Sequence, residues 1–384
     1  MKIAVKNSQD QLATPVGAGP LVHKVQLDSV RAIAILAVMA AHFFSLRITA
    51  EGGRGVTLFF VLSGYLITGI LLQCKLYVER DGQSVLFTLR QFYARRFLRI
   101  FPLYYLVVAV LWLVNDPGAH RSFGWLITYT TDIEHVVLGY RHDWPRWTVA
   151  HFWSLAVEEQ FYLIWPCVVL LVPRRRLIWV VCGVICCGPI FRLLASWLGA
   201  PLFVRAPLPF YWVDALGLGA LLAVASDPSF GLTKFISPAR IAALICGVLA
   251  IFLGRYIYSI HKIYCVAEAS YYLGYALVSV WLVSRAADGF TGMAGRVMSF
   301  RPLLWIGMIS YGVYVYHMIV MSYWKTIPGL HLAEWQNAMI VTTLTMLLSA
   351  LSFYIYERPL NNLKRYFSYR APTRPELQEV LVPA

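Results

Sequence analysis

Long apolar runs separated by short polar segments dominate this chain from about residue 27 onward. Each run is about 17 to 22 residues long, which is the length that a helix needs to cross the roughly 30 Å hydrocarbon core of a bilayer. A soluble helical protein would instead alternate apolar and polar positions with the helical period. The pattern therefore predicts an all-α, polytopic membrane protein, a bundle of about ten transmembrane helices. The predicted spans are 27–46, 56–76, 100–115, 152–172, 177–198, 207–225, 241–258, 265–284, 304–324 and 337–356.

The distribution of Lys and Arg predicts the orientation of this bundle. With the N-terminus placed in the cytoplasm, 22 of the 33 Lys and Arg residues fall on the cytoplasmic side, 10 fall on the other side, and Arg31 lies inside the first span. Positive charge marks cytoplasmic loops, so we expect both termini to be cytoplasmic. The first 26 residues are polar, and no removable signal peptide is expected there. The expected domains are a cytoplasmic N-terminal tail at 1–26, a transmembrane domain at 27–358 and a cytoplasmic C-terminal tail at 359–384.

The amino-acid composition agrees with a membrane protein and indicates which kinds of partner to expect. The chain is 59% hydrophobic and 14% charged, whereas soluble domains carry about 25% charge. The net charge of +14 could suit nucleic acid, but the basic residues cluster at the ends of apolar runs, where they would meet lipid headgroups. We therefore expect membrane lipids, and no nucleic acid, among the partners. The seven cysteines lie mostly inside apolar runs and lack a second cluster with zinc-ligand spacing, so no metal is expected.

Ionisable side chains inside the predicted spans are the first candidates for chemistry, because inserting them into a bilayer is costly. Arg31 and His42 are eleven residues apart in the first span, close to three helical turns, so both project from one face. Asp28 stands three residues before Arg31, and a purely structural ion pair between them is the alternative interpretation. For His42, the alternative is an ordinary hydrogen-bonded core residue.

The fourth predicted span carries two adjacent carboxylates, Glu158 and Glu159. Adjacent helical residues point about 100° apart, so the two cannot face one site. At least one of them must be buried among helices, where it needs a cationic partner or a raised pKa. His42 is a chemically sensible partner, because a carboxylate orients an imidazole and makes it a better base. A structural ion pair between helices remains the alternative.

Three arginines, Arg95, Arg96 and Arg99, lead into the third predicted span. Their spacing of three and four residues places two pairs on shared helix faces. A cluster of guanidinium groups suits a phosphorylated ligand. Binding of lipid headgroups, together with a role in topology, is the alternative.

Other polar side chains in or beside the spans are candidates for contact with a substrate. Helix-face tyrosines near a histidine could bind a hydroxylated acceptor, and could equally be packing residues or interfacial anchors. Ser63 as an acyl-carrying nucleophile is disfavoured, because the local sequence places no base beside it. The candidate substrate-binding residues are Ser63, Tyr65, Trp153, Asp214, Tyr311 and His317.

Six segments, in this order, resemble the acyltransferase-3 family of bacterial membrane proteins over about residues 27–360. The resemblance implies a bacterial inner-membrane enzyme that moves an acyl group, usually acetyl, from acetyl-CoA or another acyl-CoA to a hydroxyl group. The implied acceptor is a glycan or glycosylated compound, such as lipopolysaccharide O-antigen, exopolysaccharide or lipo-oligosaccharide. The matching segments are LDSVRAIAILAVMAAHF, GVTLFFVLSGYLI, FYARRFLRIFPLYY, FWSLAVEEQFYLIWP, ISYGVYVYH and YERPL.

The resemblance also implies roles for individual residues. His42 and Glu158 take the catalytic positions of the family. Relatives often carry an acidic residue at the position of Thr57. This difference leaves the role of the segment around Thr57 open, whereas the His and Glu positions match the family pattern. The positions implied to bind the acyl-CoA donor are Arg31, Arg95, Arg96 and Arg99.

Two classes of function remain in competition at this point. In the first, the protein is an acyltransferase in which His42, oriented by Glu158, removes the proton from an acceptor hydroxyl. In the second, it is a proton-coupled transporter or exporter in which His42, Glu158, Asp214 and His317 form a proton relay. Transporters often contain repeated halves, and the chain shows no such symmetry, which favours the enzyme.

Overall fold

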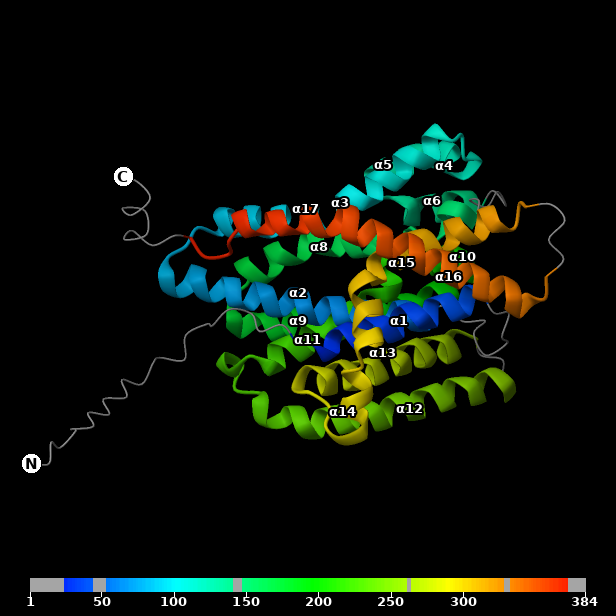
Figure 1. The fold of residues 1–384 in the computed structure, drawn as a ribbon. Coiled ribbons are helices and arrows are strands. Elements are labelled where there is room, and N and C mark those ends of the chain that lie inside the picture. Colours follow the sequence, from blue (N-terminus) through cyan, green and yellow to red (C-terminus); the bar gives the residue numbers. More distant parts are fainter. Residues whose placement is uncertain (1–23, 44–52, 141–146, 261–263, 328–331, 372–384) are drawn as a thin grey trace, which may run out of the picture.

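The computed structural model describes residues 24–43, 53–140, 147–260, 264–327 and 332–371. Within these ranges the chain is helical, without a strand. Ten of its helices are long and apolar enough to cross a membrane, and Figure 1 shows most of them running side by side. The prediction of an all-α bundle with about ten transmembrane helices is confirmed.

The ten long helices correspond one by one to the predicted spans. The last of them continues through a π-helical turn, η4 (Phe353–Glu357), into α17 (Arg358–Asn362) and the 3-10 turn η5 (Leu363–Tyr366). The long helices are α1 (Gln26–Phe43), α2 (Gly53–Asp81), α3 (Val85–Leu113), α8 (Trp153–Leu171), α9 (Arg174–Trp197), α11 (Pro209–Ser226), α12 (Ile236–Ile260), α13 (Tyr264–Asp288), α15 (Arg301–Trp324) and α16 (Glu334–Ser352). The short connecting helices are α4 (Pro117–Arg121), α5 (Phe123–Thr128), α6 (Thr131–Tyr140), α7 (Trp147–Ala150), α10 (Leu202–Arg205) and α14 (Gly292–Met298), with 3-10 turns η2 (Pro228–Phe230) and η3 (Thr233–Phe235).

The third long helix begins much earlier than the apolar pattern predicted. α3 starts at Val85, where the Ser84 side chain accepts a hydrogen bond from the backbone nitrogen of Phe87. The apolar run begins only near residue 100, because the arginines before it interrupt the hydrophobicity. They do not interrupt the helix, since Arg is a good helix former. The arginine cluster therefore lies within a long helix of the bundle rather than before it.

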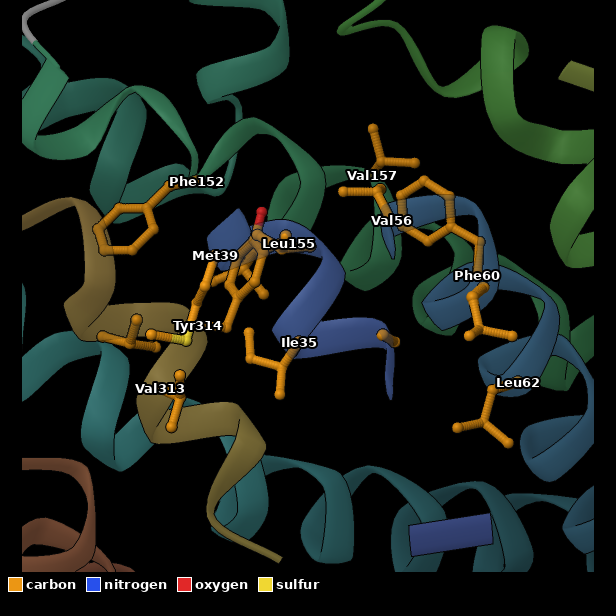
Figure 2. Packing of buried hydrophobic residues seen from close by; sticks show 14 of the residues in the cluster. Ile35, Met39, Val56, Phe60, Leu62, Phe152, Leu155, Val157, Val313 and Tyr314 are labelled. Atoms are coloured by element: carbon orange, nitrogen blue, oxygen red, sulfur yellow. The ribbon is translucent and has the colours of Figure 1, made fainter. Parts of the chain in front are cut away.

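Helix α1 is enclosed by other helices. It packs against α2, α13 and α15, and its residues Val30, Ile35 and Val38 are fully buried. Figure 2 shows Ile35 and Met39 among apolar side chains of α2, α8 and α15. Helix α12, in contrast, exposes large apolar side chains along most of its length, as a helix that faces lipid does. The ionisable residues of α1 consequently face protein, not lipid.

Helices α2 and α11 approach each other so closely that glycine is required at their contact. A Cβ atom added to Gly64 would lie 2.0 Å from the carbonyl oxygen of Leu216, and one added to Gly219 would lie 2.0 Å from that of Val61. Small residues let transmembrane backbones pack in this way. Because α2 also lines the cavity described below, this contact fixes one wall of the site.

We expect Gly64→Ala to destabilise the protein by about 1–3 kcal/mol, because the added methyl group forces α2 and α11 apart. Gly69→Ala is the matched control, since Gly69 lies in the same helix with nothing within 4 Å of the position of its Cβ atom. The control should be as stable as the wild type or slightly more so. The fraction of monodisperse protein remaining in detergent after heating would report the difference. Equal thermal stability of the two variants would show that the contact is not close-packed.

The bundle has two distinct ends. Lys75, near the end of α2, donates hydrogen bonds to the carbonyl oxygens of Val169 (2.9 Å) and Val172 (2.7 Å) at the end of α8. Arg174, at the start of α9, pairs with Glu79 of α2 at 2.6 Å. The α2–α3 and α8–α9 turns thus lie together, and we call this the basic end of the bundle.

The opposite end is formed by the last residues of α1 and α15 and by the first residues of α16. The Trp324 indole at the end of α15 donates to Oδ1 of Asn337 in α16 at 2.9 Å. The hydroxyl of Tyr323 donates to Oδ2 of Asp116, the residue that caps α4, at 3.1 Å. In the same covering layer, the buried Glu134 of α6 accepts a hydrogen bond from a serine hydroxyl, and burial raises the pKa of its carboxyl. The two ends therefore differ in charge and in covering structure.

Candidate active site

A cavity of about 300 Å³ lies between α1, α2, α3, α8 and α15 and is bordered at the basic end by the chain that follows α17. We call it the arginine cavity. Among its described lining residues, Glu158 is the one carboxylate. A cavity with such an excess of positive charge suits a ligand that carries several negative charges. The cationic lining residues are Arg31, Arg95, Arg96, Arg99 and Lys364.

The predicted donor-binding arginines all line this cavity, but their partners differ. Arg31 forms an ion pair with Asp28, as the alternative interpretation expected. The guanidinium of Arg96 lies 4.3 Å from the centre of the Tyr162 ring, in a cation–π contact. Arg99 is exposed within the cavity and, among the described residues, forms no hydrogen bond or ion pair. Arg99 is therefore the guanidinium most available to an anionic ligand.

Glu158 lies in the wall of the arginine cavity, in a hydrogen-bonded group shared by α2 and α8. The hydroxyl groups of Ser63 and Tyr162 both donate to Oε1 of Glu158, and the Tyr162 hydroxyl lies 2.9 Å from the Ser63 oxygen. Glu159 is not among the lining residues, as expected for the neighbouring position of a helix. This arrangement places Ser63, whose participation the sequence disfavoured, beside a carboxylate after all.

The predicted pairing of His42 with Glu158 is not formed in the structure. Glu158 lies more than one turn inside α8 and bonds to Ser63 and Tyr162. His42 is the second-to-last residue of α1 and lies against other histidines at the opposite end. Residue spacing shows which face of a helix a side chain occupies, but it does not show the depth at which two helices meet. His42 and Glu158 lie at different depths along the bundle, and this difference keeps them apart.

A second cavity of about 420 Å³ lies at the opposite end, between α1, α15 and α16. We call it the histidine cavity, because His42 forms part of its wall. Apolar side chains from the three helices, together with Ile327 and Leu332 between α15 and α16, supply the rest of the described lining. The polar or aromatic lining residues are His42, Phe43, Trp324, Lys325, Glu334 and Asn337.

Three histidines lie together beside the histidine cavity. The ring centroid of His317 lies 5.1 Å from that of His42 and 4.8 Å from that of His151. Nδ1 of His317 lies 2.6 Å from the Tyr314 carbonyl oxygen, and Nε2 of His151 lies 3.1 Å from the Val315 carbonyl oxygen. The other ring nitrogens of these two residues are buried without a hydrogen-bond partner in the described part of the chain. A cluster of this kind can accept or pass on a proton.

His151 is the functional candidate that the sequence interpretation missed. It stands just before the fourth predicted span, so it did not count as an intramembrane residue. Its position at the head of the segment HFWSLAVEEQ was the available signal. The structure shows that the short helix α7 turns this residue into the bundle, where it is buried beside His317.

Tyr314 stands between the two cavities. It lines the arginine cavity, and its ring centroid lies 5.4 Å from that of His317. Its hydroxyl bonds to Ser154 and lies 2.9 Å from the His151 carbonyl oxygen, to which it can donate. The rings of Tyr314 and His317 thus lie between the arginine cavity and His42, and we call them the partition.

The remaining predicted substrate residues are divided between the site and the scaffold. Tyr311 lines the arginine cavity and donates to the Ile100 carbonyl oxygen at 2.7 Å. Asp214 is buried in an ion pair with Arg192, with one N–O distance of 3.0 Å, and lies outside both cavities. This pairing joins α9 and α11 and was not visible from residues 22 positions apart.

Tyr65 and Trp153 also lie outside the two cavities as described. Lys24 donates to the Tyr65 hydroxyl at 2.8 Å, and Trp153 stacks on Trp212 with 5.6 Å between ring centroids. The first contact ties the residues before α1 to α2, and the second joins α8 to α11. Within the described residues, no group of three His, Cys, Asp or Glu side chains converges as metal ligands would.

These features define a polytopic membrane protein with a cation-lined cavity at one end and an imidazole cluster at the other. The sequence profile of the family described as acyltransferase domain matches residues 24–356, and the chain belongs to this family. The resemblance seen in the six segments is thereby confirmed over nearly the whole chain.

Curated proteins with related sequences carry acetyltransferase names. The chain is 30% identical over 374 residues to the peptidoglycan O-acetyltransferase OatA of Listeria monocytogenes, with 89% of this chain and 56% of that protein aligned. It is 26% identical over 370 residues to the putative peptidoglycan O-acetyltransferase YrhL of Bacillus subtilis, covering 87% of this chain and 54% of the other. A putative O-acetyltransferase of Staphylococcus aureus is 25% identical over 345 residues, covering 77% and 50%. The chain spans about half the length of these relatives, and no solved structure matches it.

Proposed function

We propose that this protein transfers an acetyl group from acetyl-CoA to a hydroxyl group of a glycan. The observation that carries the proposal is the arginine cavity, in which five cationic side chains and one carboxylate line about 300 Å³ between the helices. CoA carries phosphate groups at one end and a thioester at the other. Guanidinium groups bind phosphate through charge-assisted hydrogen bonds, so the cavity can hold the phosphates while the thioester arm points into the bundle.

The basic end is proposed to face the cytoplasm. Lys and Arg are concentrated at that end of the predicted topology, and acetyl-CoA is a cytoplasmic metabolite. The arginine cavity is bordered by Lys364 and Tyr369 near this end and extends inward to Ser154 and Tyr314. A donor bound in this way would bring its thioester close to the partition that separates the two cavities.

His42 is proposed as the general base. Its imidazole takes the proton of the acceptor hydroxyl, and the oxygen then attacks the thioester carbonyl carbon. The new C–O bond forms as the C–S bond breaks, and the CoA thiolate leaves and receives the proton from the imidazolium or from water. His317 and His151 stand behind His42 and can share this proton. General-base assistance contributes about 10² to 10⁴ in rate.

The histidine cavity is proposed to admit the acceptor. It lies at the opposite end of the bundle and brings an indole, an amide and two charged groups to the side of His42. Aromatic rings and hydrogen-bonding groups of this kind suit the apolar faces and hydroxyls of a sugar. A glycan acceptor is supported by the two relatives named as peptidoglycan O-acetyltransferases. The rings of Tyr314 and His317 separate donor and acceptor in this conformation, so we infer that they move during transfer.

Glu158 is proposed as a positioning residue of the donor cavity. Its carboxylate holds the Ser63 and Tyr162 hydroxyls, and Tyr162 in turn supports the Arg96 guanidinium. Glu158 therefore does not orient His42, as the sequence suggested, because the two residues line different cavities.

The test uses the purified protein in detergent with acetyl-CoA, labelled in its acetyl group, and soluble peptidoglycan fragments as the acceptor. We expect label to appear on the glycan as an alkali-labile ester, with release of one CoA thiol for each ester formed. The rival transporter function predicts that no acetyl-CoA is consumed when no membrane separates two compartments. Consumption of acetyl-CoA only by hydrolysis, with several glycans offered, would also contradict the proposal.

A further inference from the structure

Residues 363–371, the described part of the chain after α17, fold back against the basic end of the bundle. They begin with η5 and lie against α3 and against the turn between α2 and α3. We call this segment the C-terminal strap. Figure 1 shows the last helical turns beside the α2–α3 turn at one end of the bundle. The strap therefore lies at the basic end, where the arginine cavity is bordered by it.

Arg95 is the main anchor of the strap. Its Nη1 atom donates to the carbonyl oxygens of Lys364 at 2.8 Å and Phe367 at 3.0 Å. Its guanidinium also lies 4.7 Å from the centre of the Tyr369 ring. One member of the arginine cluster is thus already engaged by protein groups. It shapes the cavity wall in addition to contributing its charge.

A second anchor comes from the α2–α3 turn. Nε2 of Gln83 donates to the Tyr369 carbonyl oxygen at 2.9 Å, and its Oε1 accepts from the backbone nitrogen of Ala371 at 2.9 Å. On the outer side, Arg370 approaches Asp81 with an N–O distance of 3.8 Å. These contacts give residues 364–371 a defined position, although they follow the last transmembrane helix.

The side chains of the strap divide into two groups. Lys364 and Tyr369 line the arginine cavity together with residues of the long helices. Arg365 and Arg370 are exposed and outside the cavity lining, and Arg365 donates to the neighbouring Tyr366 hydroxyl at 2.8 Å. The strap thus presents one cation and one ring to the cavity and two cations to the surroundings.

We propose that the C-terminal strap completes the donor site, with Lys364 binding a phosphate group of the CoA moiety and Tyr369 forming a wall against it. The inference rests on the proposed function and adds to it a part of the chain that lies beyond the six family-like segments. Lys364 shares the cavity with four arginines and donates to Oδ1 of Asn361. An ammonium group placed among guanidinium groups is stabilised when an anion binds between them.

This geometry links donor binding to the position of the strap. A ligand that binds only the docked form stabilises that form according to its concentration and affinity. Bound CoA should therefore hold the strap against α3. The chemistry recognised is the phosphate-bearing half of the donor and not its acetylated thiol arm.

The first experiment compares Lys364→Gln with Arg365→Gln, which removes the same charge from the adjacent residue outside the cavity. Steady-state transfer is measured with acetyl-CoA and with S-acetyl-pantetheine, which lacks the nucleotide and its phosphates. We expect Lys364→Gln to raise the KM for acetyl-CoA about ten- to a hundredfold, the effect of one hydrogen bond to a charged group. The KM for S-acetyl-pantetheine and that for the glycan should not change, and Arg365→Gln should behave as the wild type.

Equal KM values for acetyl-CoA in the two variants would overturn the inference and leave the proposed function standing. Equal use of acetyl-CoA and S-acetyl-pantetheine by the wild type would also overturn it, because phosphate groups would then not be recognised. Failure of the wild type to transfer any acetyl group would instead count against the proposed function.

The second experiment measures how accessible the strap is to a protease and does not depend on enzymatic activity. Trypsin cuts after arginine, and Arg365 and Arg370 are exposed; mass spectrometry follows the cleavage at these sites in the intact protein in detergent. We expect CoA to slow cleavage at these sites severalfold in the wild type but not in Lys364→Gln, and pantetheine to have no effect in either. Cleavage at the same rate with and without CoA would overturn the inference, whereas protection in a protein without transferase activity would support the strap as a CoA-binding element and contradict only the transfer reaction.

Discussion

Replacement of His42 by alanine is expected to lower the rate of acetyl transfer by about 10² to 10⁴-fold while leaving the affinity for acetyl-CoA unchanged. The rate falls because the proposed base is lost. Donor affinity is retained because His42 lies in the wall of the histidine cavity and is not among the residues of the arginine cavity. The measurements are the initial rate of transfer to the glycan and the KM for acetyl-CoA, on protein shown to be monodisperse.

His120→Ala provides the matched control for this prediction. His120 lies in α4 at the same end of the bundle, is exposed, and stacks on Trp112 with 5.2 Å between ring centroids. It lines neither described cavity, so its removal should leave the rate within about twofold of the wild type. A His42→Ala variant that retains the rate of this control would remove His42 from the reaction and leave His151 or His317 as the base to be tested.

Replacement of Arg99 by glutamine is expected to raise the KM for acetyl-CoA about ten- to a hundredfold, with a smaller effect on kcat. Arg99 is exposed in the arginine cavity, and its guanidinium has no hydrogen bond or ion pair with the described residues. Its hydrogen-bonding capacity is therefore available to the ligand. Its contribution should decrease as the ionic strength rises, because an accessible charge is screened by salt.

Arg90→Gln is the control on the same helix. Arg90 is exposed on α3 and is not part of the cavity lining, so the substitution removes a charge near the same end of the bundle without touching the proposed site. Its KM for acetyl-CoA should match that of the wild type at moderate ionic strength. A similar increase in KM for both variants would indicate a general effect of surface charge, and it would contradict a phosphate contact by Arg99.

The transmembrane architecture was largely predictable because its cause is local. Each span is an apolar run of sufficient length, and a bilayer forces the backbone of such a run to satisfy its own hydrogen bonds as a helix. Each of the ten long helices overlaps one predicted span. The start of α3 was not predicted because hydropathy detects only the apolar length of a helix, whereas α3 extends from this apolar run back through Arg99 and Arg95 to Val85.

The membership of the site was predictable only in part. Arg31, Arg96 and Arg99 were identified because charge inside or beside an apolar run is costly and needs a reason, and all three line the arginine cavity. The same argument selected Asp214, which the structure explains by its pairing with the buried Arg192. The energetic cost of burying a charged side chain in a membrane indicates that it has a partner, but not whether that partner is a ligand or a side chain of another helix.

By itself, the amino-acid sequence determined the fold class, the ten helices, the resemblance to an acyltransferase family and the helix face that carries Arg31 and His42. These properties follow from the length, periodicity and order of segments along the chain. The tertiary structure alone decided that Glu158 and His42 belong to different cavities, that His151 joins His42 and His317, and that Lys364 returns to the arginine cavity. Each of these depends on the depth and angle at which helices distant in sequence pack together, and those quantities result from the close fit of many side chains and not from any one segment.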